Sequence, residues 1–311
     1  MKKLNLKVKI GTLELKNPVM PASGTFGYGV EYFDQINPES LGAIIVKGLS
    51  LKPSSGNPHP RVVETPSGLL NAVGLENIGI NKFIKSRLPL LSKFTTPIIA
   101  NIYGQTEADY EELTEIIEKE ERISAIEVNI SCPNVKKGGL AFGTSPEVCS
   151  SLVSKIRKKT KKTLIVKLTP NVTDIRPIAK SAEDSGADAL SLINTITGMA
   201  IDINTRKPML ANITGGLSGP AIRPVALRMV YEASSCVKIP VIGIGGITNY
   251  EDALSFIIAG ASAVQVGTGN FIDPKTCEKI IKGISKFMNK NKLFSIDELK
   301  GSIDLTKTQI G

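Results

Sequence analysis

Eight short apolar runs recur along this 311-residue chain, and they constrain its fold more than any other feature. Each run has the length of a buried strand, and stretches with helical periodicity lie between them, such as 107–120, 146–159, 223–235 and 249–260. Eight successive strand–helix units predict an α/β fold, a (β/α)8 TIM barrel. The runs are NPVMPAS (17–23), GAIIVK (42–47), PIIAN (97–101), AIEVN (125–129), TLIVK (163–167), DALSLIN (188–194), PVIGIGG (240–246) and AVQVGT (263–268).

The connections between these runs favour a barrel over an open sheet. A glycine joins helix to strand in LGAIIV, SGADAL and AGASAV, as expected where a helix ends before a buried strand. A doubly wound open sheet would need a GxGxxG loop after its first strand, and PASGTFGYG lacks that spacing. Alternating Leu4, Leu6, Val8 and Ile10 predict an N-terminal β-hairpin that turns at Gly11.

The chain shows no linker or low-complexity segment, so we expect one domain over residues 1–311. The long stretch 48–96 is rich in proline, glycine and asparagine, and we interpret it as an excursion over the mouth of the barrel. Length alone does not decide between one large barrel and two small domains.

Composition excludes several classes of partner. The net charge of +9 comes from scattered lysines, and aromatic residues are only 5% of the chain, so we expect no nucleic-acid partner. No apolar run reaches the roughly 18 residues that a membrane helix needs, and no signal peptide is apparent. The four cysteines are far apart and form no CxxC pair, which argues against a metal or iron–sulfur site and predicts a cytoplasmic location.

Every predicted strand ends in a polar side chain or in glycine. In a (β/α)8 barrel the carboxyl ends of the strands form the active-site face. A lysine at the end of a buried strand is costly unless it meets an anion, so this pattern predicts a ligand site. The strand-end residues are Ser23, Lys47, Asn101, Asn129, Lys167, Asn194, the pair Gly245–Gly246, and the pair Gly267–Thr268.

The last two strands carry a more specific signal. GIGG and VGTGN follow strands seven and eight, where these barrels usually bind phosphate through backbone N–H groups. A phosphate site beside a wide polar mouth suggests a phosphorylated cofactor that lies across the barrel.

General acid–base chemistry must fall to a group other than histidine. The single histidine, His59, lies between prolines, and we expect it to be solvated. Cysteine, lysine or a carboxylate can serve instead. Glu127 shares the inward face of its strand with Asn129, and we expect it to pair with a lysine such as Lys167. Cys132 follows the end of the same strand, at the root of a basic, glycine-containing loop.

Long, ordered motifs make the chain similar to the dihydroorotate dehydrogenase family over about residues 5–285. They are PASGTFGYG, KGLSLKPSSGNPHPRVVETPSGLLNAVGLEN, NISCPNVKKGGLAFG, VKLTPN, NTITG and IGIGGI…VGTG. The resemblance implies a flavoprotein barrel with one non-covalent FMN per chain. Such an enzyme oxidises (S)-dihydroorotate to orotate, a reaction at a CH–CH group, in de novo pyrimidine (UMP) biosynthesis.

The loop after the fourth strand resembles class 1B of this family. Class 1 uses a cysteine as the base, whereas the membrane-bound class carries a serine and a targeting extension, and this sequence shows neither. The class 1B resemblance implies a partner subunit that holds FAD and a 2Fe–2S cluster and passes electrons to NAD. It also implies a heterotetramer of two catalytic and two electron-transfer chains.

The resemblance carries over to individual residues of this sequence. It implies that Cys132 is the catalytic base, while Cys149, Cys236 and Cys277 lie on helical patterns and are expected to pack. The substrate-binding residues would be Lys47, Asn71, Ala72, Val73, Gly74, Leu75, Asn129, Asn194 and Thr195. The FMN-binding residues would be Ser23, Lys47, Gly48, Asn101, Asn129, Lys167, Ile193, Gly219, Gly245, Gly246, Gly267 and Thr268.

Three other functions remain open at this point. A fumarate-linked class 1A enzyme would perform the same oxidation with another acceptor. A Schiff-base aldolase would use Lys167, which ends a barrel strand, and would be colourless. A non-catalytic phosphate-binding barrel would turn over no acceptor and leaves the two strand-end lysines unexplained.

Overall fold

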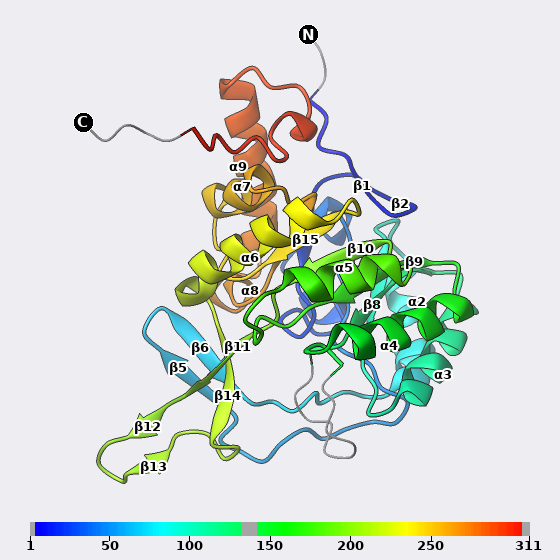
Figure 1. Ribbon diagram of the computed structural model, residues 1–311, viewed down its shortest axis with the longest axis vertical. Helices are drawn as coiled ribbons and strands as arrows, with labels where there is room; N and C mark the ends of the chain where they lie inside the picture. Colours follow the sequence, from blue (N-terminus) through cyan, green and yellow to red (C-terminus); the bar gives the residue numbers. More distant parts are fainter. Residues whose placement is uncertain (1–3, 132–141, 307–311) are drawn as a thin grey trace.

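The computed structural model describes residues 4–131 and 142–306, and its centre is a barrel of parallel strands (Figure 1). The sheet order is β3-β16-β15-β10-β9-β8-β7-β4. A hydrogen bond of 2.9 Å from Gly42 N–H to the Val19 carbonyl links its two ends, so the barrel is nearly closed. The strands are β3 (Val19–Pro21), β4 (Ile44–Ile45), β7 (Ile98–Ile102), β8 (Ile123–Asn129), β9 (Thr163–Lys167), β10 (Ala189–Leu192), β15 (Val241–Ile244) and β16 (Ala263–Val266).

Each predicted strand is present, and the predicted (β/α)8 barrel is confirmed. Strands such as β7 and β9 are buried at every residue, because the barrel interior covers one face and the helices cover the other. A strand buried on both faces is apolar along most of its length, which explains why the runs were visible in the sequence.

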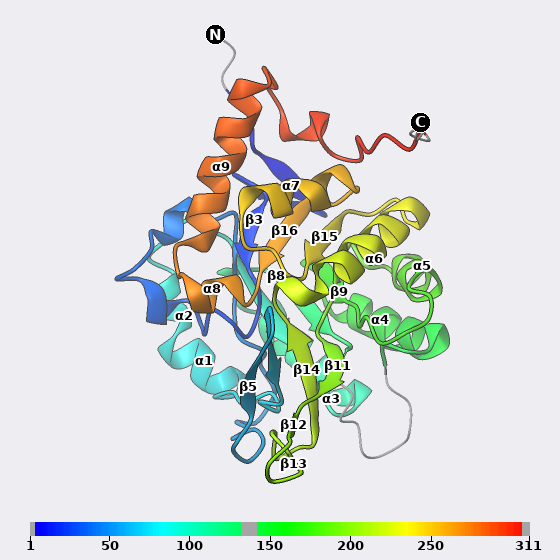
Figure 2. The same cartoon turned by 90° about the vertical axis from the view of Figure 1, so that its left-hand side faces the viewer.

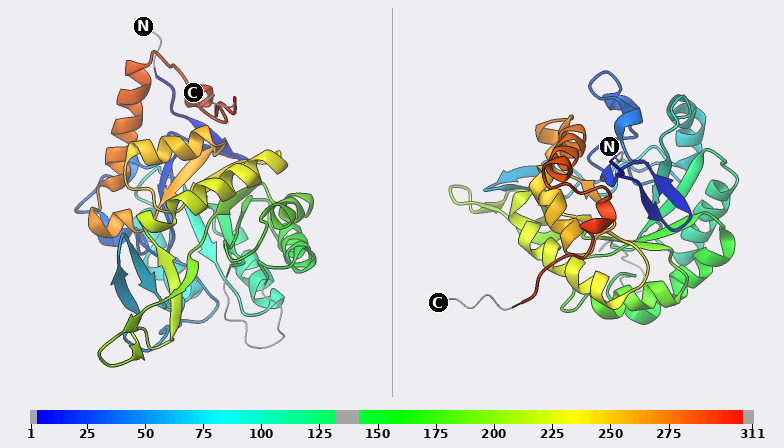
Figure 3. Two further views of the ribbon diagram at one scale, coloured as in Figure 1. Left: turned by 60° about the vertical axis from the view of Figure 1, so that its left-hand side comes forward. Right: turned by 90° about the horizontal axis from the view of Figure 1, so that it is seen from above.

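Helices surround the barrel (Figure 2; Figure 3, right), and the four predicted helical patterns correspond to α3, α4, α6 and α7. Their starts follow from local chemistry: Thr106 and Asp109 form a capping box at α3, and the Ser145 and Asn249 side chains cap α4 and α7. The helices are α1 (Ile80–Ser86), α2 (Leu88–Leu91), α3 (Glu107–Glu118), α4 (Pro146–Lys159), α5 (Arg176–Asp184), α6 (Arg223–Cys236), α7 (Tyr250–Ile258), α8 (Gly269–Ile272) and α9 (Thr276–Lys290). Short 3-10 helices are η1 (Val30–Tyr32), η2 (Pro38–Ser40), η3 (Pro220–Ile222) and η4 (Ile296–Glu298).

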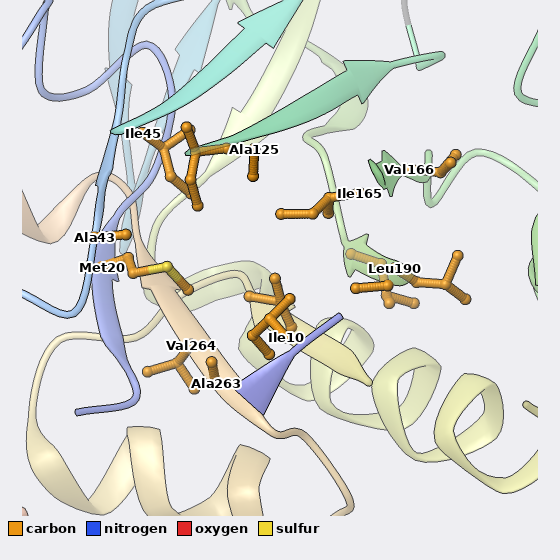
Figure 4. Packing of buried hydrophobic residues seen from close by; sticks show 14 of the residues in the cluster. Ile10, Met20, Ala43, Ile45, Ala125, Ile165, Val166, Leu190, Ala263 and Val264 are labelled. Atoms are coloured by element: carbon orange, nitrogen blue, oxygen red, sulfur yellow. The ribbon is translucent and has the colours of Figure 1, made fainter. Parts of the chain in front are cut away.

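The predicted N-terminal hairpin closes the amino-terminal end of the barrel. It consists of β1 (Val8–Ile10) and β2 (Leu13–Leu15), with Gly11 at φ +58° in the turn. Ile10 is only 1% exposed and lies among side chains of the barrel strands (Figure 4). The Thr12 N–H donates to Thr163 Oγ1 over 3.1 Å, at the start of β9. This end of the barrel is therefore packed.

A second, antiparallel sheet in the order β11-β14-β6-β5 lies at the other end of the barrel (Figure 1). Its strands, which the sequence did not predict, are β5 (Val62–Thr65), β6 (Gly68–Asn71), β11 (Ile196–Met199) and β14 (Thr214–Ser218). A small hairpin, β12 (Ile201–Asp202) and β13 (Lys207–Pro208), extends from it. The predicted excursion over 48–96 is shorter than expected, because residues 80–91 form α1 and α2 beside the barrel.

In the part of the chain that the structure describes, we find no helix with both the length and the apolar character needed to cross a bilayer.

Candidate active site

Polar side chains meet inside the barrel near the carboxyl ends of its strands. Alternate residues of a strand point to the same side, so the inward positions can be followed from strand to strand. Asn101 on β7, Glu127 on β8 and Lys167 on β9 are all buried and lie in contact. The structure thus brings together two of the strand-end residues that the sequence singled out.

Glu127 is the centre of this cluster and is fully buried. Its Oε1 accepts a hydrogen bond of 2.6 Å from Asn101 Nδ2 and lies 3.8 Å from Lys167 Nζ. The expected pairing of Glu127 with Lys167 is confirmed. Its Oε2 accepts from Ser191 Oγ over 2.8 Å and from Gln265 Nε2 over 2.6 Å. Sequence reasoning missed Ser191 and Gln265, which lie on the predicted strands β10 and β16, where every residue is buried.

Lys167 also connects opposite sides of the barrel. Its Nζ donates to Ser23 Oγ over 3.1 Å, and Ser23 follows β3. Only 4% of Lys167 is exposed, so its ammonium is held in a mostly dry environment. A buried ammonium attracts anionic groups more strongly than an exposed one, because the surrounding dielectric is lower.

A second group of amides and hydroxyls follows β8 and β10. Asn129 Oδ1 accepts from the Ser131 backbone N–H over 3.2 Å and from Asn194 Nδ2 over 3.5 Å. Asn194 Nδ2 also donates to Ser131 Oγ, and Asn194 Oδ1 accepts from the Thr195 N–H over 2.8 Å. Three predicted residues, Asn129, Asn194 and Thr195, therefore lie together, and Ser131 joins them.

Lys47 has a partner that the sequence did not predict. Its Nζ lies 3.5 Å from Glu76 Oε2, and Arg61 Nη2 lies 2.8 Å from the same oxygen. Lys47, and to a lesser extent Arg61, lower the pKa of Glu76 from its ordinary value. Because Glu76 directly follows the segment 71–75, this ion pair holds that segment near the end of β4.

The segment 71–75 is attached at several points. Asn71 Nδ2 donates to the Gly216 carbonyl over 3.2 Å, and Asn57 Nδ2 donates to the Ala72 carbonyl over 2.9 Å. A Cβ added at Gly216 would lie 2.0 Å from Thr195 Oγ1, so Thr195 packs directly against this strand. These contacts join the predicted substrate segment to the group around Asn194. The other members of the segment are Val73, Gly74 and Leu75.

The turns after β14, β15 and β16 also meet. A Cβ added at Gly246 would lie 2.8 Å from the Gly219 carbonyl oxygen, and Gly246 adopts φ +69°. Thr268 Oγ1 donates to Ser218 Oγ over 2.7 Å. The residues expected to bind phosphate therefore converge from three parts of the chain. Gly245 belongs to the same turn as Gly246. The buried Ile193 donates a hydrogen bond of 3.0 Å from its backbone N–H to the Ile244 carbonyl, just before this turn.

Gly267 borders a space that the described side chains leave unfilled. Among the described residues, a Cβ at this position would meet only the Ala22 Cβ, at 4.0 Å. Its φ lies outside the left-handed region, so neither backbone strain nor packing against the described residues requires glycine here. By contrast, a Cβ at Gly48 would lie 3.1 Å from Asn101 Oδ1. The space above Gly267 fits a group such as a phosphate that approaches the backbone closely.

Cys132, the predicted base, lies outside the described residues. Cys149 and Cys277 are buried, as predicted, and Cys236 is partly buried against the core. Burial raises the pKa of Cys149 to about 12 and also raises the pKa of Cys277. His59 is exposed, as expected.

Comparison with known proteins identifies close relatives. The family model described as dihydroorotate dehydrogenase matches residues 5–288. The chain is 55% identical over 303 residues to a protein of Geotalea uraniireducens (strain Rf4), covering 97% of this chain and 99% of the relative. That relative is named dihydroorotate dehydrogenase B (NAD(+)), catalytic subunit. Relatives with the same name from Geotalea daltonii and Geobacter sulfurreducens are 54% and 53% identical over 305 residues, covering 98% of this chain and 100% of each relative.

Proposed function

The chain belongs to the dihydroorotate dehydrogenase family, and we propose that it is the FMN-containing catalytic subunit of an NAD-linked dihydroorotate dehydrogenase. This oxidoreductase converts (S)-dihydroorotate to orotate in de novo pyrimidine biosynthesis. One observation carries the proposal from family to chemistry: lysines, asparagines and glycine turns from separate strands meet at the carboxyl end of one barrel. We propose that residues 1–311 form one domain around this site.

FMN fits the residues at this end of the barrel. The room over Gly267 and the turns at Gly219, Gly245 and Gly246 suit the phosphate, and the buried ammonium of Lys167 suits the polar edge of the ring. FMN supplies the hydride acceptor, and the protein orients it and tunes its surroundings. The proposed FMN-binding residues are Ser23, Lys47, Gly48, Asn101, Asn129, Lys167, Ile193, Gly219, Gly245, Gly246, Gly267 and Thr268.

The proposed substrate site uses charge and amides from three regions. The Lys47 ammonium attracts the carboxylate of dihydroorotate, and the side-chain amides of Asn129 and Asn194 bind its polar ring edges. Thr195 and the segment 71–75 complete the site. The contacts of Asn71 with Gly216 and of Glu76 with Lys47 support this assignment, because they hold the segment beside the strand ends.

Cys132 is proposed as the base because of its place in the sequence and the family resemblance. It comes three residues after Asn129, the last residue of β8. The ring of dihydroorotate loses a proton from one carbon and a hydride from its neighbour, so a base is needed beside the first carbon. A thiolate performs this task, and its proton is then released to solvent.

The proposed partner is an electron-transfer subunit with FAD and a 2Fe–2S cluster, in a cytoplasmic heterotetramer of two catalytic and two electron-transfer chains. The name of the relatives, a catalytic subunit with NAD(+) as acceptor, supports a division of labour between two proteins. The sequence itself has neither a GxGxxG fingerprint after its first strand nor a CxxC pair.

An absorption spectrum tests the cofactor assignment. Protein purified from cells supplied with flavin should be yellow, and denaturation should release one FMN per chain. A denatured extract without flavin would contradict the proposal and would favour the colourless Schiff-base aldolase at Lys167. Efficient use of fumarate by the chain alone would instead indicate class 1A behaviour.

A further inference from the structure

One buried carboxylate, that of Glu127, connects five strands of the barrel. Glu127 lies on β8, and its four partners lie on β7, β9, β10 and β16. Its exposed fraction is 0%, and its partners lie just inside the end of the barrel where the glycine turns converge. A buried charge with so many partners is costly to build unless each contact is well placed.

The two oxygens of this carboxylate contact different sets of residues. Oε1 contacts Asn101 and Lys167, the two neighbours that the proposed function places against FMN. Oε2 accepts from Ser191 and Gln265, which that proposal does not use. The Oε2 side therefore anchors the carboxylate, and the Oε1 side faces the groups that bind the cofactor.

Every neighbour of Glu127 in this network presents a donor or a positive charge to it. The amides of Asn101 and Gln265 and the hydroxyl of Ser191 donate hydrogen bonds to the carboxylate, and the Lys167 ammonium lies 3.8 Å away as an ion pair. An acceptor without hydrogens satisfies these three donors beside a cation, whereas an amide in its place would turn an N–H toward another donor. The network therefore needs a carboxylate rather than a group of similar volume.

The same contacts fix the direction of the Lys167 ammonium. Ser23 Oγ accepts from Nζ over 3.1 Å on one side, and Glu127 Oε1 lies 3.8 Å away on another. The hydrogen bond to Ser23 and the attraction of the carboxylate therefore restrict where the ammonium can lie. Asn101 is fixed in a similar way, because its Nδ2 is committed to Glu127 and its Oδ1 lies beside Gly48.

We propose that Glu127 is a positioning residue for the cofactor, which it serves by orienting the Lys167 ammonium and the Asn101 amide. This inference rests on the proposed function, since it requires FMN to bind beside these two groups. Its consequence is that Glu127 contributes to FMN affinity through Lys167 and Asn101, and not only to the stability of the barrel.

A coupling experiment tests this role. The full chain is stripped of FMN and titrated with FMN, and the quenching of flavin fluorescence gives the dissociation constant. Glu127→Gln should weaken binding roughly 10-fold, the size of a strong coupling between contacting residues. In a Lys167→Met background the same replacement should have a clearly smaller effect. Equal effects in both backgrounds would overturn the proposal.

Ser191→Ala is the matched control, because it removes a hydrogen bond from Oε2 of the same carboxylate. It should lower the melting temperature but change the FMN dissociation constant by less than about 2-fold. If Ser191→Ala and Glu127→Gln weakened FMN binding in proportion to their losses of stability, Glu127 would be only structural and the proposal would fail.

Glu127→Asp covers the case in which the glutamine variant does not fold. The charge is kept, but the side chain is one methylene shorter, so FMN should bind roughly 3–10-fold more weakly. If this variant bound FMN as tightly as the parent, the inference about Glu127 would be wrong, but the proposed function would stand. Failure of the parent chain to bind FMN would overturn both this inference and the proposed function.

Discussion

Cys132 follows the end of β8 and is the residue whose replacement tests the proposed chemistry most directly. Cys132→Ala should keep its FMN, because the thiol is not among the proposed phosphate or ring contacts. Reduction of the flavin by dihydroorotate should slow roughly 10²–10⁴-fold, the usual contribution of a positioned general base. Cys132→Ser should also be impaired near neutral pH. Stopped-flow absorbance of the flavin measures these rates.

The control for this variant is Cys149→Ala, which should change the rate little. Cys149 is buried on α4, and burial raises its pKa to about 12, so it holds no thiolate near neutral pH. In the parent protein the rate should rise with pH as the Cys132 thiolate forms, since an ordinary thiol titrates near ~8.5. A Cys132→Ala protein that kept its flavin and the parent rate would exclude Cys132 as the base.

Gly267 offers a test of the phosphate site that separates binding from folding. Gly267→Ala should leave the melting temperature unchanged, because in the part of the chain that the structure describes the added Cβ would meet only Ala22 Cβ, at 4.0 Å. The same methyl group would occupy the room proposed for the phosphate, so FMN affinity should fall at least roughly 10-fold, as a close contact is lost. Fluorescence titration with FMN and thermal unfolding measure the two effects.

Gly243→Ala is the control for this prediction, because it adds the same methyl group at a packed position of the core. Its Cβ would lie 2.5 Å from Phe256 Cδ1 in the core, so this variant should unfold more easily by roughly 1–3 kcal/mol. A Gly267→Ala protein that bound FMN as tightly as the parent would show that no ligand occupies this room.

At the scale of elements, the barrel was predictable and the second sheet was not. Barrel strands such as β9 are buried on both faces, so they appear as continuous apolar runs in the sequence. Strand β14 reads TGGLS and pairs with β6 across a separation of 149 residues, as in Leu69 with Ser218. Neither its composition nor its periodicity is typical of a strand, and its partner is distant, so only the folded chain reveals the pairing.

The candidate site likewise contains residues that could be predicted from the sequence and residues that could not. Residues at strand ends, such as Lys167 and Asn194, could be predicted because the architecture places all strand ends on one face. The pairing of Lys47 with Glu76 could not be predicted, since it depends on how a long irregular segment returns to the barrel. Ser191 was overlooked inside an apolar run, because every residue of β10 is buried and the sequence pattern does not show which ones face the barrel interior.

Glu39 on η2 ties two loops together and gives a prediction about pH. Its carboxylate accepts 2.5 Å and 2.6 Å hydrogen bonds from the N–H and Oγ1 of Thr95, before β7, and contacts Lys16. The bonds from Thr95, aided by Lys16, lower the pKa of Glu39 to about 2. A lowered carboxyl pKa stabilises the folded state above the unfolded value near ~4.3, and this contribution is lost as pH falls toward about 2.

Glu39→Gln should therefore lower the free energy of unfolding at pH 7 by at most about 1 kcal/mol, because the pair is more than one-third exposed. The difference between parent and variant should shrink between about pH 4 and pH 2, as measured by urea unfolding at several pH values. Thr95→Val, which removes one of the donors, should show the same trend. A difference that stayed constant down to pH 2 would contradict this role for Glu39.

At the scale of the whole molecule, the two ends of the barrel differ in what fills them. The hairpin of β1 and β2 packs into the amino-terminal end, where Ile10 is buried. The carboxyl end holds the buried ions and amides, and the second sheet lies next to this end of the barrel (Figure 3, left). We propose that dihydroorotate enters at the carboxyl end and that the electrons leave this chain through a separate partner subunit.

The isolated chain should consequently perform only the first half of the reaction. Dihydroorotate should bleach its flavin, but NAD should reoxidise it slowly, because the sequence has neither a GxGxxG fingerprint nor a CxxC pair for a further redox centre. Addition of an electron-transfer subunit with FAD and an iron–sulfur cluster should restore NAD reduction, followed as NADH absorbance. Fumarate is the control acceptor, and it should remain slow with or without the partner. Fast NAD reduction by the chain alone would contradict the division of labour between two subunits, since hydride would then pass directly from this barrel to the nicotinamide.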